Sequence, residues 1–268
     1  MQIRLLNKKI GDNNPVFIIA EIGINHNGDP ALASKMIGEA ARAGADAVKF
    51  QIVNPDESYA KDTLSYQIFK KTRLTFDALK KLKDEAASKD VIFFATAGDL
   101  TSLDMMMELG VPLIKISSGC MTNFLLIRKA ARTKVPIILS TGMSYLSEVK
   151  ETIFELEKNG AKDIVLSHCV STYPAAYEEI NLNSMVTLKS LFRYPVGYSD
   201  HTEGTLASCA AVAIGAKVIE KHFTLNKKFK GPDHRFSADP KELKQLVEDI
   251  RNIEKVMGSE VKRPTKTE

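Results

Sequence analysis

Short apolar segments and longer amphipathic segments alternate along the whole chain. Eight short runs are rich in β-branched and other apolar residues, and each is long enough for one strand. These runs cover residues 16–23, 47–53, 91–98, 113–119, 136–142, 163–169, 195–201 and 218–224. Segments with a 3.6-residue period of apolar positions lie between and after them, at 31–45, 76–90, 100–110, 124–134, 146–160, 183–193, 205–216 and 241–258. The pattern predicts an alternation of strands and helices from end to end.

The predicted strands lack the polar face of a strand that is exposed to water on one side. Strands that are apolar on both faces and joined by helices predict parallel pairing, with helices covering the sheet. Eight such units in 268 residues predict a (β/α)8 TIM barrel of the α/β class, a fold of about 250 residues. A doubly wound open sheet is the alternative, but the turn after the first strand, EIGINHNG at 21–28, does not match GxGxxG.

Three segments fall outside the repeating pattern. Residues 2–11 predict a short N-terminal β-hairpin that would plug the bottom of the barrel. Residues 54–76 are long and polar, and they predict a loop that reaches over the site. Residues 259–268 are polar and predict a linker remnant or disordered tail, which leaves residues 1–258 as the barrel domain.

All eight predicted strands begin apolar and end polar. The polar side chains at their ends are Glu21, Lys49, Gln51, Thr96, Lys115, Ser117, Ser118, Ser140, Thr141, Ser167, His168, Ser199, Asp200, His201, Glu220, Lys221 and His222. In a parallel barrel the C-terminal ends of all strands meet at the face that carries active sites. The alternation of side chains along a strand places Glu220 and His222 on one side and Lys221 on the other, and it likewise pairs Lys49 with Gln51.

The five histidines all fall at predicted strand ends or in the loops that follow. They are His26, His168, His201, His222 and His234. His201 and His222 end adjacent strands, so their imidazoles can hold one divalent metal, with water and substrate oxygens in the remaining positions. The alternative is that each imidazole hydrogen-bonds a neighbouring carboxylate such as Asp200 or Glu220.

Two lysines on inward-facing strand positions predict an anion site. Lys49 and Lys115, together with nearby serine hydroxyls, suit a doubly charged anion such as a phosphate beside a carboxylate. The alternative is a buried ion pair of a lysine with Glu21. Glu21, Glu220 and Asp233 would accept hydrogen bonds from substrate hydroxyls or serve as general bases. For Asp233 the alternative is a carboxylate that only stabilises a turn.

Composition and charge exclude several classes of protein. Hydrophobic residues make up 44% and charged residues 26% of the chain, as in soluble globular domains. No apolar run approaches the roughly 18 residues of a membrane span, and the N-terminus lacks a signal-peptide core, so we expect a cytoplasmic protein that does not bind membranes. A net charge of +4 without a basic run does not favour nucleic acid. Cys120, Cys169 and Cys209 have no metal-site spacing and are expected to be reduced thiols in packing positions.

A series of motifs resembles the sialic acid synthase family. The motifs are AEIGINHNG (20–28), VKFQ (48–51), KISSG (115–119), LSTGM (139–143), SHCVSTYP (167–174), GYSDHTEG (197–204), VIEKHFTL (218–225) and GPDHRFS (231–237). They occur in order from about residue 15 to 258. The family comprises N-acetylneuraminate synthase, its legionaminic and pseudaminic acid relatives and enzymes of spore-coat polysaccharide biosynthesis.

The resemblance implies a transferase that joins phosphoenolpyruvate to an N-acetylated mannosamine-type sugar aldehyde, giving a nonulosonic acid and phosphate. It implies a TIM barrel, Mn²⁺ or Mg²⁺ as cofactor, and a possible homodimer. His201 and His222 match the family's metal ligands. The positions that match phosphoenolpyruvate contacts are Lys49, Thr96, Lys115, Ser118, Ser140 and Ser199. Those that match the sugar side and the reacting centre are Glu21, Gln51, Tyr173, Glu220 and Asp233, with Glu220 the candidate to steer water.

The sequence departs from the family pattern at three places. Residues 95–98 read ATAG where the family usually has STPF, and Ser171 stands where asparagine is frequent. The family normally continues into an antifreeze-like C-terminal domain that reaches a partner's sugar site, whereas this chain ends at Glu268. Two other functions stay open: another phosphoenolpyruvate-dependent synthase of the octulosonate or heptulosonate type, and a non-catalytic barrel that binds a sugar or an anion.

Overall fold

Eight parallel strands close into one barrel in the computed structural model, which describes residues 1–268. Going round the barrel, the strands are β10 (Val218–His222), β3 (Phe17–Gly23), β4 (Ala47–Ile52), β5 (Ile92–Ala97), β6 (Ile114–Ile116), β7 (Ile137–Ser140), β8 (Ile164–Cys169) and β9 (Val196–Asp200). β10 pairs with β3, which closes the ring and excludes the open-sheet alternative. The (β/α)8 prediction is confirmed.

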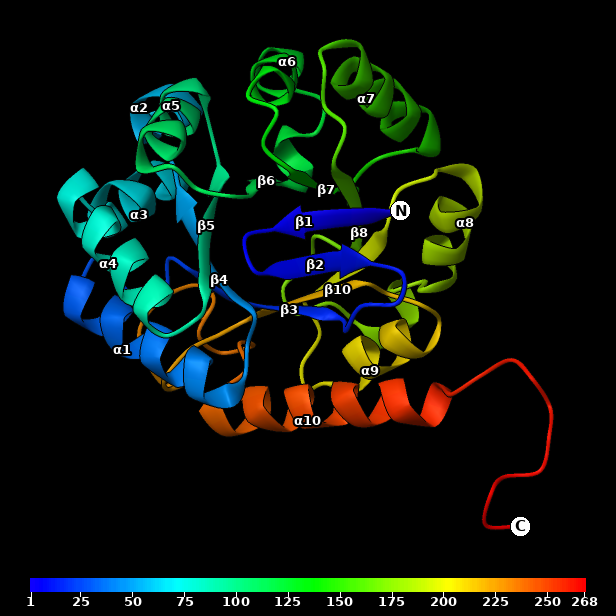
Figure 1. Cartoon of the computed structure of the whole chain (residues 1–268). Helices are drawn as coiled ribbons and strands as arrows, with labels where there is room; N and C mark the ends of the chain where they lie inside the picture. Colours follow the sequence, from blue (N-terminus) through cyan, green and yellow to red (C-terminus); the bar gives the residue numbers. More distant parts are fainter.

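A ring of helices surrounds the barrel (Figure 1). The main helices are α1 (Pro30–Ala43), α4 (Phe76–Ser88), α5 (Leu100–Leu109), α6 (Phe124–Arg132), α7 (Leu146–Lys158), α8 (Asn183–Leu191), α9 (Leu206–Ala213) and α10 (Pro240–Met257). Their apolar faces and the outward side chains of the strands form one continuous hydrophobic core. Burial of this apolar area is the main force that holds the ring against the barrel.

Local sequence signals explain where these helices begin and end. The Asp29 side chain accepts a hydrogen bond from Ala31 N, and Pro30 occupies the first turn of α1, where its missing N–H costs nothing. Gly44 ends the same helix with φ of 89°, a conformation that a residue with a Cβ rarely adopts. Asp239 and Glu242 form a reciprocal capping box at the start of α10.

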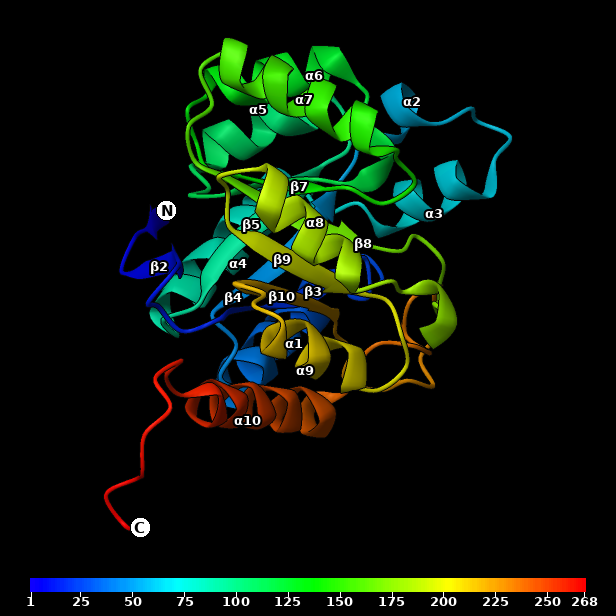
Figure 2. The same cartoon turned by 90° about the vertical axis from the view of Figure 1, so that its right-hand side faces the viewer.

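The N-terminal hairpin covers one end of the barrel. β1 (Gln2–Leu5) and β2 (Lys8–Gly11) pair antiparallel, as the sequence predicts. Ile3, Leu5 and Ile10 are almost completely buried and belong to the main core. In Figure 2 this hairpin lies at the end of the barrel opposite to the α2–α3 segment. The barrel is therefore plugged at its N-terminal end, and its other end is left for a site.

The segment after β4 is more ordered than the predicted loop. It contains α2 (Pro55–Ser58) and α3 (Leu64–Thr72), and it projects beyond the strand ends (Figure 2). Thr63 caps the nine-residue helix α3. Lys70 and Lys71 lie in its last turn, where their positive charges interact favourably with the negative end of the helix dipole. The expectation of a loop was wrong over α3, because the polar composition hid these capping signals.

The last residues extend away from the barrel. Residues 259–268 contain no helix or strand, and every one is exposed (Figure 1). None of the helices combines the length and apolar character that crossing a lipid bilayer requires.

Candidate active site

A large cavity of about 810 Å³ lies at the C-terminal ends of the barrel strands. All the predicted site residues except Asp233 line it. Those that do are Glu21, Lys49, Gln51, Thr96, Lys115, Ser118, Ser140, Tyr173, Ser199, His201, Glu220 and His222. The barrel thus brings together side chains that are as far apart in the sequence as Glu21 and His222, and it does so at the face where TIM barrels place their active sites.

Strand register explains why these side chains converge. Residues paired across parallel strands point to the same face, and every second residue along a strand follows them. His222 pairs with Glu21, and Glu21 pairs with Lys49. Thr96 pairs with Lys115 on the next two strands. The polar residues of the site therefore occupy inward-facing positions near the ends of these strands.

A buried cluster of two lysines and two glutamates forms the floor of the cavity. Lys115 Nζ lies 2.8 Å from Glu220 Oε2, and Lys49 Nζ lies 3.3 Å from the same oxygen. Lys49 Nζ is also 3.4 Å from Glu21 Oε1 and donates a hydrogen bond to Thr96 Oγ1. The predicted Lys–Glu21 pair exists, but Glu220 is the carboxylate that both lysines share. The negative charge of Glu220 thus stabilises both ammonium groups at once.

The two glutamates of this cluster differ in their ionisation. Burial raises the pKa of Glu21 from 4.5 to about 7, and the nearby Lys49 only partly opposes this shift. Burial acts on Glu220 in the same direction, but Lys115 and Lys49 outweigh it and hold the pKa of Glu220 far below its usual range. Glu220 is therefore a permanent carboxylate, whereas Glu21 can exchange a proton near neutral pH. Its Oε2 is buried and lacks a hydrogen-bond partner.

Hydroxyl groups and a close-packed glycine lie beside the lysines. Ser199 Oγ donates to Glu220 Oε1 at 2.6 Å. Ser118 Oγ accepts from the backbone N–H of Gly142 at 3.1 Å. A Cβ at Gly142 would lie 2.8 Å from Ser118 Oγ and equally close to the side chains of Cys169 and Ser171, so only glycine fits there. These contacts fix small polar groups around the space next to Lys115.

The two predicted metal ligands lie side by side on the cavity wall. The ring centroids of His201 and His222 are 5.6 Å apart. His201 Nδ1 is 2.6 Å from the carbonyl oxygen of Val170, so it serves as the donor and leaves Nε2 free. His222 Nδ1 is buried without a hydrogen-bond partner. Neither ring bonds Asp200 or Glu220, so the carboxylate alternative for these histidines is wrong.

The histidine pair is neutral and has no further side-chain ligand of the usual kind. Burial lowers the pKa of His201 to about 4 and holds the pKa of His222 well below its usual value. Neutral imidazole is the form that binds metal. No cluster of three or more His, Cys, Asp or Glu residues is arranged around a common ion. The pair fits one ion only if oxygen atoms of water or substrate complete the coordination.

Asp233 lies next to His222 and does not line the cavity. Its Oδ2 is 3.9 Å from His222 Nδ1, and burial raises the pKa of Asp233 to about 6. Tyr173 and Phe236 pack against the His222 ring, with centroids 5.9 Å and 5.2 Å away. The rings of Tyr173 and His201 are closer, at 4.2 Å. Aromatic packing therefore restrains both imidazoles.

Several lining residues escaped the sequence analysis. The α2–α3 segment contributes Glu57, Ser58, Tyr59 and Phe69 to the cavity, so the expected reach over the site is confirmed. Asp99 follows β5 and lines the same space, and its position as the N-cap of α5 was the available signal.

The three cysteines are free, as expected, but two of them are not only packing residues. Cys120 and Cys169 line the cavity, and Cys169 Sγ lies 3.1 Å from Ser118 Oγ. The departure at 95–98 also has a physical reason. A Cβ at Gly98 would lie 2.7 Å from Val53 Cγ2, so the Val53 side chain occupies the space that a larger residue would need. Ser171 lines the cavity as well.

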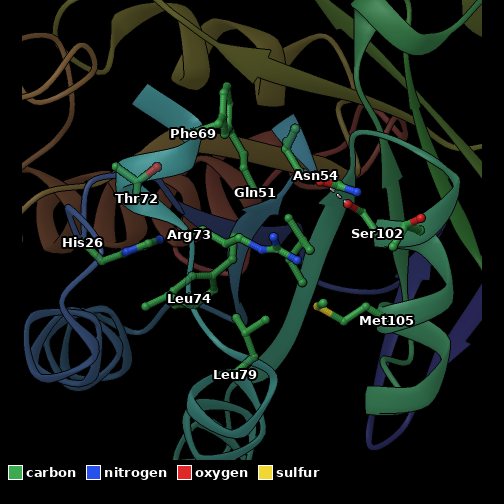
Figure 3. A pocket seen from close by; sticks show the side chains of 14 residues that line it. His26, Gln51, Asn54, Phe69, Thr72, Arg73, Leu74, Leu79, Ser102 and Met105 are labelled. Carbon is green, nitrogen blue, oxygen red and sulfur yellow. Dashed lines mark hydrogen bonds between the residues drawn. The ribbon is translucent and has the colours of Figure 1, made fainter. Parts of the chain in front are cut away.

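A second, much smaller cavity lies beside the first one (Figure 3). Its volume of about 20 Å³ is close to the space of a single water molecule. His26, Gln51 and Arg73 are among its lining residues, and it touches the main cavity through Gln51 and Phe69. Phe69 and Thr72 of α3 line this space, and Gln51 is the only predicted site residue among its lining residues.

Sequence comparison connects this site with known synthases. The profile of the NeuB family matches residues 36–262. The N,N'-diacetyllegionaminic acid synthase of Campylobacter jejuni is 46% identical over 267 residues, which cover 94% of this chain and 80% of that protein.

Solved structures of synthases have the same fold as this chain. The N-acetylneuraminic acid (sialic acid) synthetase of Leptospira borgpetersenii, crystallised in complex with citrate, superposes with a TM-score of 0.96 at 40% identity and covers 100% of this chain and 93% of that one. A truncated 3-deoxy-D-arabino-heptulosonate 7-phosphate synthase of Thermotoga maritima reaches a TM-score of 0.77 at 19% identity, covering 98% and 95%, and shows a shared fold alone. By sequence and by structure, this chain belongs to the NeuB family.

Proposed function

We propose that this protein condenses phosphoenolpyruvate with an N-acetylated mannosamine-type sugar aldehyde to give a nonulosonic acid and phosphate. One observation carries the proposal: Lys49 and Lys115 lie on the floor of a barrel-mouth cavity whose wall presents the neutral imidazoles of His201 and His222. The names of the relatives in Campylobacter and Leptospira support the choice of product class.

Lys115 and Lys49 would bind the anionic groups of phosphoenolpyruvate. Lys115 contacts only Glu220, so one of its three donors is available to an anion. Lys49 also contacts Glu21 and Thr96, so phosphoenolpyruvate would replace one of these contacts. Ser118, Ser140 and Thr96 line the same cavity, and their hydroxyls would share the remaining oxygens. Lysine is suited to this role because it stabilises a bound anion by charge without giving up a proton.

The residues present fit a divalent metal. Two neutral imidazoles, one with a buried nitrogen that lacks any partner, leave a place that a cation would complete. His201 through Nε2 and His222 through Nδ1 would hold Mn²⁺ or Mg²⁺. A metal bound there supplies Lewis-acid polarisation of the sugar aldehyde.

The chain's own residues would organise the rest of the reaction. C3 of phosphoenolpyruvate forms a bond to the aldehyde carbon, and the aldehyde oxygen takes up a proton and becomes a hydroxyl. Water then adds to C2 and releases one proton. The C–O bond to phosphate breaks last, and the remaining proton of the C2 hydroxyl leaves with the phosphate, so that C2 becomes a ketone. Lys49 and Lys115 hold the phosphate and carboxylate through these changes, so the reacting carbons stay close. The ionised Glu220 faces the same space and would orient the water. Glu21, protonated while the anion is bound, would donate its proton to the aldehyde oxygen and then recover one from the water, because a pKa of about 7 suits proton transfer in both directions at neutral pH.

Phosphate release with a panel of aldoses tests the reaction. Purified protein with Mn²⁺ and phosphoenolpyruvate receives N-acetylmannosamine, its 6-phosphate, a 2,4-diacetamido-6-deoxy analogue, arabinose 5-phosphate or erythrose 4-phosphate. We expect release with an N-acetylated sugar only. Release with a pentose or tetrose phosphate alone would support the octulosonate or heptulosonate type of synthase. No release with any sugar would support a non-catalytic binding barrel.

His222→Ala tests the metal site within the same proposal. We expect loss of Mn²⁺ binding and loss of activity, with an unchanged circular dichroism spectrum. His168→Gln is the matched control, because His168 also ends a barrel strand but bonds the carbonyl of Ile180 and does not line the main cavity. Full activity of metal-stripped wild-type protein would refute the metal role.

A further inference from the structure

A charged residue that faces away from the cavity precedes each of the two histidines. Asp200 comes before His201 at the end of β9, and Lys221 comes before His222 at the end of β10. The two strands are adjacent, and Lys221 pairs directly with Asp200 in their register. The side chains meet on the outer face of the barrel, where Lys221 Nζ lies 3.1 Å from Asp200 Oδ2 with almost no exposure to solvent.

The Asp200 carboxylate also holds the backbone on the far side of His201. Its Oδ1 accepts from Thr202 N at 2.9 Å and from Thr202 Oγ1 at 2.8 Å. Its Oδ2 accepts from Ser208 Oγ at 2.6 Å, which ties it to α9. Lys221 Nζ donates to the carbonyl of Thr202 at 2.6 Å. The two peptide units that follow His201 are therefore fixed by one buried carboxylate and its lysine partner.

We infer that Asp200 and Lys221 are positioning residues that set the distance between the His201 and His222 imidazoles, an inference that rests on the metal role in the proposed function. An ion pair between the residues just before the two ligands links the two strands at the level of the site. His222 makes no side-chain hydrogen bond through Nδ1, so its placement depends on its strand and on ring packing. Groups that orient metal ligands typically change metal affinity 10–100-fold when they are removed.

Mn²⁺ binding to the full chain, without substrates, tests the inference. Free Mn²⁺ is measured by electron paramagnetic resonance during titration of wild type, Asp200→Asn and Lys221→Met. We expect each variant to bind at least tenfold more weakly, and the double variant to bind about as weakly as either single one, because the two residues act through one contact. Activity of Asp200→Asn should recover at raised Mn²⁺ concentration.

Asp46→Asn is the matched control. Asp46 accepts from Lys8 at 3.0 Å, from Arg251 at 3.2 Å and from the Ile18 backbone N–H, so it is a comparable tie between elements at the opposite end of the barrel. We expect it to lower the melting temperature and to leave the dissociation constant of Mn²⁺ within about twofold of wild type. A role in stability alone would make Asp200→Asn behave like this control, and that result overturns the inference.

Two further measurements keep the test decisive. Ser208→Ala removes one hydrogen bond to Asp200 and keeps the ion pair, so it should fold and bind Mn²⁺ about two- to fivefold more weakly. If the charge variants do not fold, wild-type affinity in Ser208→Ala overturns the inference. If wild type itself binds no Mn²⁺, the metal role fails and the inference fails with it, and the wild-type titration distinguishes this outcome from a failure of the positioning role alone.

Discussion

Lys115 reaches the cavity floor from the middle of a short strand, and its ammonium already contacts Glu220. We predict that Lys115→Ala raises KM for phosphoenolpyruvate at least tenfold and changes KM for the sugar less than about threefold. A hydrogen bond to a charged group contributes about 1.5–3 kcal/mol, which corresponds to this range. Steady-state kinetics with each substrate varied in turn provides the measurement. Lys129→Ala, which removes a lysine paired with Asp104 outside the cavity, should leave both constants unchanged.

Glu21 links substrate binding to proton uptake. With a pKa of about 7, Glu21 is about half protonated at pH 7, and a bound anion nearby raises that pKa further. We therefore predict net proton uptake when phosphoenolpyruvate binds at pH 7, measured by calorimetry in buffers of different ionisation enthalpy. Glu21→Gln should remove this uptake. Equal uptake in the variant would assign the proton to another group.

The same residue makes stability depend on pH with a defined sign. Folding raises the pKa of Glu21 from 4.5 to about 7, so between these values the folded state binds more protons than the unfolded state. The contribution of Glu21 to stability is most favourable below pH 4.5 and falls as the pH rises to 7. Glu21→Gln should gain stability relative to wild type by up to about 3 kcal/mol between pH 4.5 and 8. Urea unfolding at several pH values gives the difference, and a pH-independent difference would contradict the assignment.

At the residue scale the sequence predicted the direction of side chains better than their partners. The two-residue period correctly placed Lys49, Gln51, Glu220 and His222 inside the barrel and Lys221 outside it. It did not predict that Glu220 is the partner of Lys115, because these residues are 105 positions apart and meet across the barrel interior. Such contacts depend on the stagger of all eight strands, which local pattern does not contain.

Asp99 makes several of the hydrogen bonds that connect the α2–α3 segment to the barrel, beside those of Ser102 with Asn54 N and of Thr101 with Glu57. Asp99 Oδ2 accepts from Asn54 N at 2.6 Å and from Ser58 Oγ at 3.2 Å, while its Oδ1 accepts from Ser102 N. We predict that Asp99→Ala increases amide hydrogen exchange over residues 54–72 at least tenfold and raises KM for the sugar. Mass spectrometry of peptides from that range measures the exchange.

Asp104→Ala is the control for the Asp99 prediction. Asp104 lies on the same helix, α5, and forms an exposed pair with Lys129, so its loss should not change exchange in the segment. Unchanged exchange in Asp99→Ala would mean that the segment is held by its other contacts, including those of Thr101 and Ser102. The polar composition of residues 54–76 predicted where this segment lies. It did not predict the contacts of Asp99 with the segment, because an aspartate at that position is already explained by its role as the N-cap of α5.

At the scale of the whole molecule, the periodic pattern was sufficient for the barrel. Eight apolar runs joined by amphipathic helices leave few other arrangements, and closure follows from the pairing of β10 with β3. Residues 259–268 extend from the end of α10. The boundary of the barrel domain at residue 258 remains a prediction. The shape of the cavity could not be read from the pattern, because it depends on close approaches such as that of Gly98 to Val53.

The hairpin should contribute to stability without taking part in the reaction. We predict that Leu5→Ala lowers the free energy of unfolding by about 2–5 kcal/mol, because a fully buried side chain leaves a cavity at the barrel bottom. The kinetic constants below the unfolding transition should be unchanged, since the site lies at the other end. Denaturant unfolding and steady-state kinetics check both parts. Leu6→Ala, at a turn position that is 70% exposed, should have little effect on either.

Because the hairpin closes the N-terminal end of the barrel, substrates and products reach and leave the cavity only from the C-terminal end of the strands. Lys115 lies at the floor of the cavity and is 2% exposed. A sugar bound nearer the cavity entrance would therefore obstruct access of phosphoenolpyruvate to Lys115. We therefore expect ordered binding, with phosphoenolpyruvate first, because its site is deeper in the cavity, and the sugar second. A sugar that arrives early should form a dead-end complex, detectable as inhibition by excess sugar that added phosphoenolpyruvate relieves.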